Sequence, residues 1–319
     1  MTEKQPFPAK HGPRWWIWVI IILAVLVLIF LLGVANKKSS STSGEFFIGT
    51  EPYIATLYVE GTMMTVESMN SVYNHAYLMS TLDELMADPM NEALVLYISS
   101  GGGECLAADE LSRKVQEYQT ETGRPVYAYG YDYAASGAYW LAATADYIML
   151  NPYCISGSIG VSMGQLFDAS GFLAEHNVQL RKVVSGAQKQ SNDGLTPLTD
   201  ESVAVYQSIV DEEFQLFLNW VAAGRKMTVE ELTPLADGRI YSGLQAAANG
   251  LADATGDYGD LLDLVYQEVG DLPVVDYQPA TDLDWMSYFL SLAPGSQRDA
   301  LSSLGITSPV ALYDPVSGF

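Results

Sequence analysis

The stretch from Ala93 to Gly103, ALVLYISSGGG, carries the strongest indication of the fold. Its first six residues, Ala93 to Ile98, are apolar, which predicts a β-strand covered on both faces as strands of parallel sheets are. Glycines follow, and apolar positions at helical spacing from Leu106 to Tyr118 then predict a helix. A buried strand, a glycine turn and a helix together form the repeating unit of an α/β domain.

The chain on either side of this stretch continues the alternation of strands and helices. Further strands are predicted at 54–59, 125–129, 147–150 and 178–184, and further helices at 72–86, 135–143 and 199–222. Alternating elements of these lengths favour an α/β fold with a largely parallel sheet.

The N-terminal region contains a candidate membrane segment. Residues 15–34, WWIWVIIILAVLVLIFLLGV, carry no charge and are long enough to cross a hydrocarbon core of about 30 Å. Three tryptophans stand at its start, where indole rings favour the membrane interface. A cleaved signal peptide is the alternative, because Gly33-Val34-Ala35 resembles a cleavage site, but the apolar run exceeds the usual length.

These features predict five regions along the chain. They are a cytoplasmic tail (1–14), a membrane anchor (15–34), a polar linker (35–50), a folded α/β domain (51–270) and a Pro-rich C-terminal tail (271–319). More basic residues precede the anchor than follow it, so the domain is expected outside the cytoplasm, on a single-pass cell-membrane protein. The tail is expected either to remain unpacked or to dock on a neighbouring subunit.

The composition excludes several classes of function. With 38 acidic and 15 basic residues the net charge is −23, which repels phosphate backbones and argues against nucleic-acid binding. Two cysteines and three histidines leave little material for a structural zinc site or a disulfide framework. No metal site and no cofactor are predicted.

Two serines and a glycine turn are candidates for chemistry. Ser136 follows a predicted strand and opens a helix, as either a helix N-cap or a nucleophile would. Residues 101–103 could form a phosphate site, an oxyanion hole or a plain tight turn. Residues 155–161 predict a strand with a bulge, in which a buried Ser158 hydroxyl would need a partner.

A serine nucleophile needs a base, and the histidines are poorly placed for that role. His75 lies in the first predicted helix and His176 in a polar connection, so both are expected to be solvated. Lys189 lies in a loop of small residues, outside any helical charge pattern. A lysine can act as a base where its surroundings disfavour the charged form.

Taken in order, these segments resemble the signal peptide peptidase A family, membrane-anchored serine proteases with the Clp protease and crotonase fold. The matching segments are Ser-x-Gly-Gly-Gly (99–103), Ala-Ala-Ser-Gly-x-Tyr (134–139), Gly-Ser-Ile-Gly-Val (157–161), Ser-Gly-x-x-Lys (185–189) and Ala-Asp-Gly-Arg-Ile-Tyr-Ser-Gly-Leu-Gln-Ala (236–246). The resemblance covers residues 51–268 and the short, single-repeat form of the family. It implies a superhelix of repeated ββα units.

The resemblance also implies roles for individual residues. Ser136 would be the nucleophile and Lys189 the general base, with Ser158 orienting the lysine. Backbone N–H groups of Gly102 and Gly137 would form the oxyanion hole. In double-length relatives the serine and lysine sit on different repeats, so a single-repeat chain is expected to assemble as a closed homo-oligomeric ring. Ser136 of one subunit would then face Lys189 of the next.

The expected substrates are short apolar peptides, such as signal peptide remnants, and Trp140, Met163 and Leu166 are candidates to line their pocket. The sequence also departs from the family pattern. Ser99-Ser100-Gly101-Gly102 stands for Ser-Pro-Gly-Gly, and Gln188 and Gln190 flank the lysine in place of an aromatic residue and an aspartate. A membrane-tethered peptide-binding pseudoprotease and a crotonase-like acyl-CoA enzyme therefore remain as alternatives.

Overall fold

The computed structural model describes residues 51–66, 72–189 and 191–279, all within one of the two compact units of the chain. The predicted N-terminal tail (1–14), anchor (15–34) and linker (35–50) and the C-terminal tail beyond residue 279 lie outside the described residues. Within the described ranges, no helix is both long and apolar enough to cross a membrane.

The described residues form a largely parallel sheet with strand order β6-β5-β3-β2-β1-β8, and β4 and β7 branch from β3. The strands are β1 (Tyr53–Glu60), β2 (Asn91–Ser100), β3 (Val126–Ala135), β4 (Tyr147–Leu150), β5 (Ile155–Gly157), β6 (Ile240–Ser242), β7 (Ala254–Thr255) and β8 (Val274–Tyr277). Every pairing is parallel except that of β5 with β6. The predicted α/β class with a largely parallel sheet is confirmed.

Several of the helices begin or end where the sequence supplies caps. They are α2 (His75–Ala87), α3 (Cys105–Thr122), α4 (Gly137–Ala142), α5 (Ser170–Glu175), α6 (Asp200–Arg225), α7 (Val229–Leu232), the 3₁₀ turn η1 (Thr233–Leu235), α8 (Gly243–Ala248) and α9 (Tyr258–Val269). Before α2, the Asn74 side chain accepts a hydrogen bond from Tyr77 N at 2.8 Å. After α3, Gly123 takes a left-handed conformation (φ 70°) that suits glycine.

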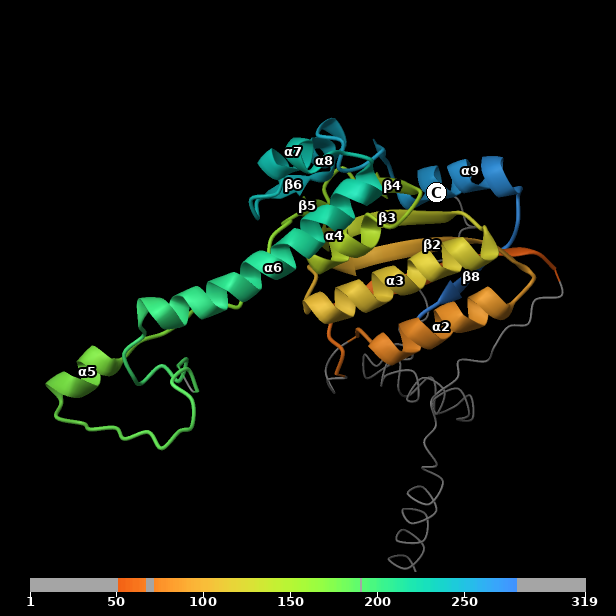
Figure 1. Cartoon of the computed structure of the whole chain (residues 1–319). Coiled ribbons are helices and arrows are strands. Elements are labelled where there is room, and N and C mark those ends of the chain that lie inside the picture. Colours follow the sequence, from red (N-terminus) through yellow and green to blue (C-terminus); the bar gives the residue numbers. More distant parts are fainter. Residues whose placement is uncertain (1–50, 67–71, 190, 280–319) are drawn as a thin grey trace, which may run out of the picture. The chain divides into compact units, whose positions relative to one another are not determined.

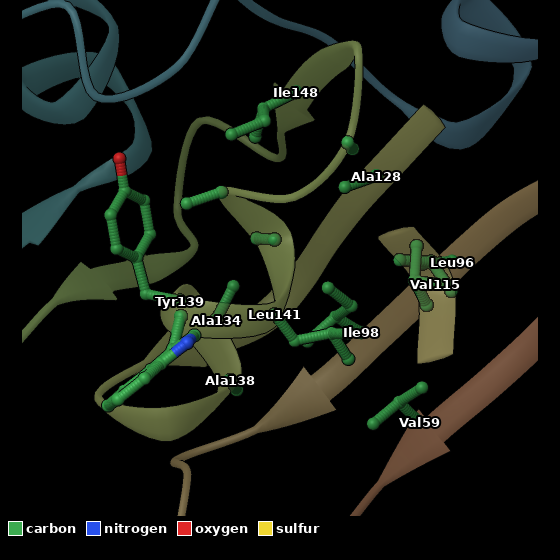
Figure 2. Close-up of a cluster of buried hydrophobic side chains, with 14 of the residues drawn as sticks. Val59, Leu96, Ile98, Val115, Ala128, Ala134, Ala138, Tyr139, Leu141 and Ile148 are labelled. Atoms are coloured by element: carbon green, nitrogen blue, oxygen red, sulfur yellow. The ribbon is translucent and has the colours of Figure 1, made fainter. Parts of the chain in front are cut away.

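Helices cover both faces of the sheet, with α2 and α3 on one face and α9 on the other (Figure 1). Strand β2 shows the consequence. Its Leu94, Leu96 and Ile98 face the larger core, whereas Ala93 and Val95 face the cluster beneath α9. Figure 2 shows Leu96 and Ile98 of β2 in the same buried cluster as Val115 of α3 and Leu141 of α4. The prediction that Ala93–Ile98 is covered on both faces is therefore confirmed.

Strand β3 changes partner part-way along its length. Its first half pairs with β4 and its last three residues pair with β5. Gly130 lies between the halves, where a Cβ would come within 2.4 Å of the Leu150 side chain, so a larger residue does not fit. The split brings the carboxyl ends of β2, β3 and β5 to one edge of the sheet, because neighbouring parallel strands end on the same side.

Two expectations from the sequence differ from the structure. Residues 178–184 do not form a strand and are almost all exposed, although their composition is β-rich. A strand needs a neighbour to satisfy its backbone groups, and this segment pairs with none within the described residues. The sheet also extends past the predicted domain boundary at residue 270, because β8 pairs with β1.

Candidate active site

Ser136 lies on a sharp turn between β3 and α4. Its backbone adopts φ 55° and ψ −128°, an uncommon conformation for a residue with a side chain. Its N–H donates to Gly157 O at 2.8 Å, which ties the turn to the end of β5. The serine takes the N-cap position of α4, but its hydroxyl makes no capping hydrogen bond and has no partner within the described chain. A simple capping role therefore does not account for this hydroxyl.

The glycine turn after β2 packs against the Ser136 turn. A Cβ on Gly102, whose φ is 88°, would lie 2.5 Å from Gly137 N and 2.9 Å from the Ser136 Cβ. A Cβ on Gly103 would lie 2.0 Å from Met63 O. Glycine is required at both positions because two backbone segments approach too closely for any side chain.

The structure separates two possible oxyanion donors in this turn. The Gly102 N–H, predicted as a donor, already donates to Ser100 Oγ at 3.1 Å, and that hydroxyl in turn donates to Gly61 O at 2.5 Å. Gly103 lines the cavity beside Ser136, and its N–H has no partner within the described residues. A Cβ on Gly137 would stand 3.4 Å from Gly103 N. Beside Ser136, the N–H groups of Gly103 and Gly137 are therefore the two that have no acceptor among the described residues.

A cavity of about 560 Å³ opens beside Ser136. Its apolar lining comes from Val161, Val210, Phe214 and Ala236, and Ser136 and Ser158 also line it. Ser158 has φ 51° and donates its N–H to Arg239 O at 2.8 Å, so the loop between β5 and α5 is attached to the start of β6. Thus the structure brings together Ser136, Ser158 and Gly137.

Cys105 is another possible nucleophile at the cavity. Burial, together with a hydrogen bond to the Glu213 carboxylate, raises the pKa of Cys105 to about 11. The thiol therefore stays protonated at neutral pH, and a protonated thiol is a poor nucleophile. Ser136 is the better candidate.

Lys189 lies apart from this cavity. It is exposed, in a turn closed by a hydrogen bond from its N–H to Gly186 O at 3.1 Å, and it is not among the described residues that line the cavity. The neighbouring Gln188 accepts a hydrogen bond from the Ser202 hydroxyl at 2.9 Å, which ties the turn to the start of α6. A single chain does not bring both members of the predicted dyad to one cavity.

The histidines are not alternatives to Lys189 at this cavity. His75 is buried, with Nδ1 2.8 Å from Tyr73 Oη and Nε2 3.0 Å from a Glu110 oxygen, so the expectation that it is solvated is wrong. The packing of α2 on α3 encloses it. His176 is exposed as expected. Neither lines the cavity, and the described residues hold no cluster of three or more His, Cys, Asp or Glu suited to a metal ion.

Sequence reasoning missed one whole wall of the cavity. Val210, Asp211 and Phe214 reach it from α6, because residues three and four positions apart share a helix face. Nothing in the sequence of this amphipathic helix distinguishes these positions from core positions. The proposed pocket residues do not line the cavity: Trp140 is buried in the core, stacked 4.8 Å from Phe217, while Met163 and Leu166 lie elsewhere.

Comparison with known proteins decides the family. The profile of peptidase family S49 matches residues 118–270, which include Ser136, Ser158 and Lys189. A Haemophilus influenzae protein named Protease 4 is 28% identical over 272 residues, covering 81% of this chain. An Enterococcus faecium protein named as a candidate signal peptide peptidase SppA is 32% identical over 211 residues, covering 66% of this chain.

Residues 118–270 of the chain therefore form a peptidase family S49 region. This confirms the resemblance to signal peptide peptidase A and the prediction of a serine peptidase. A Methanocaldococcus jannaschii protein named as a candidate protease is 29% identical over 290 residues, which cover 88% of this chain and 92% of the relative. The matches cover only 61% of the Enterococcus protein and 43% of the Haemophilus protein.

Solved structures add a weaker likeness. A membrane-bound stomatin-specific protease matches with a TM-score of 0.44 at 12% identity, over 73% of this chain and 100% of the other. The catalytic domain of ClpP from Plasmodium falciparum matches with a TM-score of 0.39 at 12% identity, over 63% of this chain and 84% of the other. Both scores are too low to assign the fold beyond the α/β class.

Proposed function

We propose that this S49 peptidase is a membrane-anchored serine endopeptidase that uses a Ser136–Lys189 dyad. Ser136 Oγ attacks the peptide carbonyl while the neutral Lys189 amine accepts its proton. The lysine then donates that proton to the leaving amine, and water hydrolyses the acyl-enzyme. The observation that carries the proposal is that Ser136 lies on a strained turn, lines the cavity, and has a hydroxyl without a partner among the described residues.

The backbone N–H groups of Gly103 and Gly137 serve as the oxyanion hole in this proposal. Both flank Ser136, and neither is committed to another acceptor within the described residues. Donors fixed before the reaction stabilise the tetrahedral oxyanion, and removing one costs about 3 kcal/mol in comparable enzymes. The Gly102 N–H instead donates a hydrogen bond to Ser100 Oγ and so stabilises the turn.

The base comes from a neighbouring subunit in a closed ring. Lys189 lies on a segment, residues 162–199, in which no described residue is buried. Several of its apolar side chains are exposed in the single chain, which is typical of surfaces that pack against another subunit. There Lys189 is proposed to reach the partner's cavity and to be oriented by Ser158.

The remaining parts of the proposal follow from the sequence and from the relatives. The uncharged residues 15–34 support a single-pass anchor with an extracytoplasmic domain, and the named function of the Enterococcus relative supports cleaved signal peptides as substrates. The sheet is also proposed to consist of repeated ββα units that form a superhelix of the Clp protease and crotonase type.

A serine-reactive phosphonate tests the proposal directly. Full-length protein in detergent micelles should be labelled at Ser136 and should lose peptidase activity in proportion. If a lysine amine is the base, activity should rise with pH, and a profile that is flat between about pH 6 and 9 would count against it. The exposed position of Lys189 in one chain favours a peptide-binding pseudoprotease as second candidate, and absence of labelling would support it.

A further inference from the structure

The cavity beside Ser136 has an uneven distribution of charge. Among the described residues, its lining includes two carboxylates, Asp211 and Asp237, and no lysine or arginine. The two carboxylates come from different elements. Asp211 lies on α6, and Asp237 lies in the loop before β6.

The two carboxylates differ in their partners. Asp237 is paired with Arg239, whose Nε lies 2.7 Å from Oδ1, and this pairing lowers the pKa of Asp237 to about 2. The pair is therefore close to neutral as a whole. Asp211 accepts a hydrogen bond from Gln207 Nε2 at 2.7 Å but forms no ion pair within the described chain. Of the two lining carboxylates, Asp211 is therefore the one without an ion pair among the described residues.

The walls around Asp211 are apolar. Val210 and Phe214 lie on the same face of α6, and Val161 lines the cavity from the loop after β5. Phe214 and Val161 are partly buried against the core, which limits their movement. An apolar wall near a single carboxylate suits a side chain with a long hydrocarbon stem and a cationic end, because the stem packs while the cation pairs.

We propose that Asp211 makes this cavity selective for peptides with a lysine or arginine beside the cleaved bond. The inference rests on the proposed function, and it narrows the substrates from apolar peptides in general to apolar peptides that carry a basic residue. Signal peptides match this class, because a positively charged region precedes their apolar region. Acidic side chains are disfavoured at the same position.

Three peptides that differ at one position test the proposal. The position carries lysine, norleucine or glutamate, where norleucine has the lysine stem without the amine. The full-length protein in detergent micelles should cleave the lysine peptide with a kcat/KM about tenfold or more above the norleucine peptide, as expected for a hydrogen bond between charged groups. Asp211→Asn should remove most of this preference.

Glu212→Gln is the matched control, because Glu212 is the next acidic residue on α6, is exposed and is not part of the cavity lining. It should keep the preference. Equal rates for lysine and norleucine in the unmodified protein would overturn the inference, as would loss of the preference in both variants. If Asp211→Asn slows all three peptides equally, Asp211 acts on the catalytic machinery and the inference is wrong.

Binding separates this inference from the proposed function. Ser136→Ala protein should bind the lysine peptide more tightly than the norleucine peptide by a similar factor, even if no peptide is cleaved by the unmodified protein. If the phosphonate does not label Ser136 but the lysine peptide still binds more tightly, the proposed peptidase activity is wrong and the proposed selectivity of the cavity is supported. Equal binding of the two peptides to this variant would overturn the specificity alone.

Discussion

The sheet domain and the segment 162–199 carry the two halves of the proposed dyad in opposite environments. Ser136 lies between buried residues, since Ala134 and Ala138 on either side of it are completely buried. Lys189 lies where no described neighbour is buried, and Val183 in the same segment is 98% exposed. One chain thus positions the proposed nucleophile by its own packing but leaves the proposed base exposed, so the proposed dyad would need a second chain to be completed.

The largest loss of activity should come from variants that remove one member of the proposed dyad. Ser136→Ala and Lys189→Ala should each lower kcat/KM by more than about a thousandfold, as expected for members of one catalytic unit. Mixed oligomers of the two variants should regain part of the activity, because some interfaces then pair an intact serine with an intact lysine. The measurement is peptidase activity after co-expression.

Mixed oligomers that form but stay inactive would show that the dyad lies within one chain. Size analysis of tagged subunits gives the necessary control, since it shows whether both variants are present in one particle.

A smaller effect is expected in the glycine turn. Gly102→Ala should lower kcat by about a hundredfold or more, because the new Cβ would clash with Gly137 N and displace an oxyanion donor. Gly101→Ala is the control within the same turn, since a Cβ there meets no atom within 4 Å. Equal activities of the two variants would contradict the packing of the turn against Ser136.

The two regions should also differ in their contribution to stability. Leu96→Ala should lower the free energy of unfolding by about 2–5 kcal/mol, because Leu96 is completely buried in the core (Figure 2). Val183→Ala should change it by less than about 0.5 kcal/mol in dilute, dissociated protein. Urea unfolding measures both, and a large loss for Val183→Ala would mean that the segment packs within one chain.

Acid should lower the free energy of unfolding through Asp253 of the sheet domain, but not through the carboxylates of the segment 162–199. Burial alone would raise the pKa of Asp253, but hydrogen bonds from Arg225 and from Ile148 N outweigh it and hold the pKa below its ordinary value. This contribution to stability is present above about pH 4 and is lost as the pH falls through the lowered pKa. The free energy of unfolding of the Asp253→Asn variant should therefore depend less on pH in acid. At pH 7 it should be lower than that of the unmodified protein.

Asp193 provides the comparison in the segment. The Leu195 N–H and the Lys182 ammonium lower its pKa as well, but it lies in the exposed region. Asp193→Asn should leave the pH dependence of global unfolding unchanged. An equal effect of both variants would show that the segment unfolds together with the sheet.

Several features could be predicted from the sequence because they depend on neighbouring residues. The apolar run Ala93–Ile98 predicted a strand buried on both faces, and helical spacing predicted α3 and α6. The β-rich run 178–184 failed as a prediction because strand formation depends on a partner that local sequence does not specify. The motif around Ser136 likewise predicted the strand-to-helix turn on which the serine lies.

The sequence by itself determined the α/β class, the S49 motifs and the residue types of the candidate site. Only the tertiary structure decided that the Gly102 N–H donates a hydrogen bond to Ser100 Oγ, and that Gly103 and Asp211 of α6 line the cavity. It also placed Lys189 outside the cavity of its own chain. The physical reason is that hydrogen-bond partners and cavity walls are set by contacts between segments far apart in sequence, whereas periodicity and turn chemistry are local.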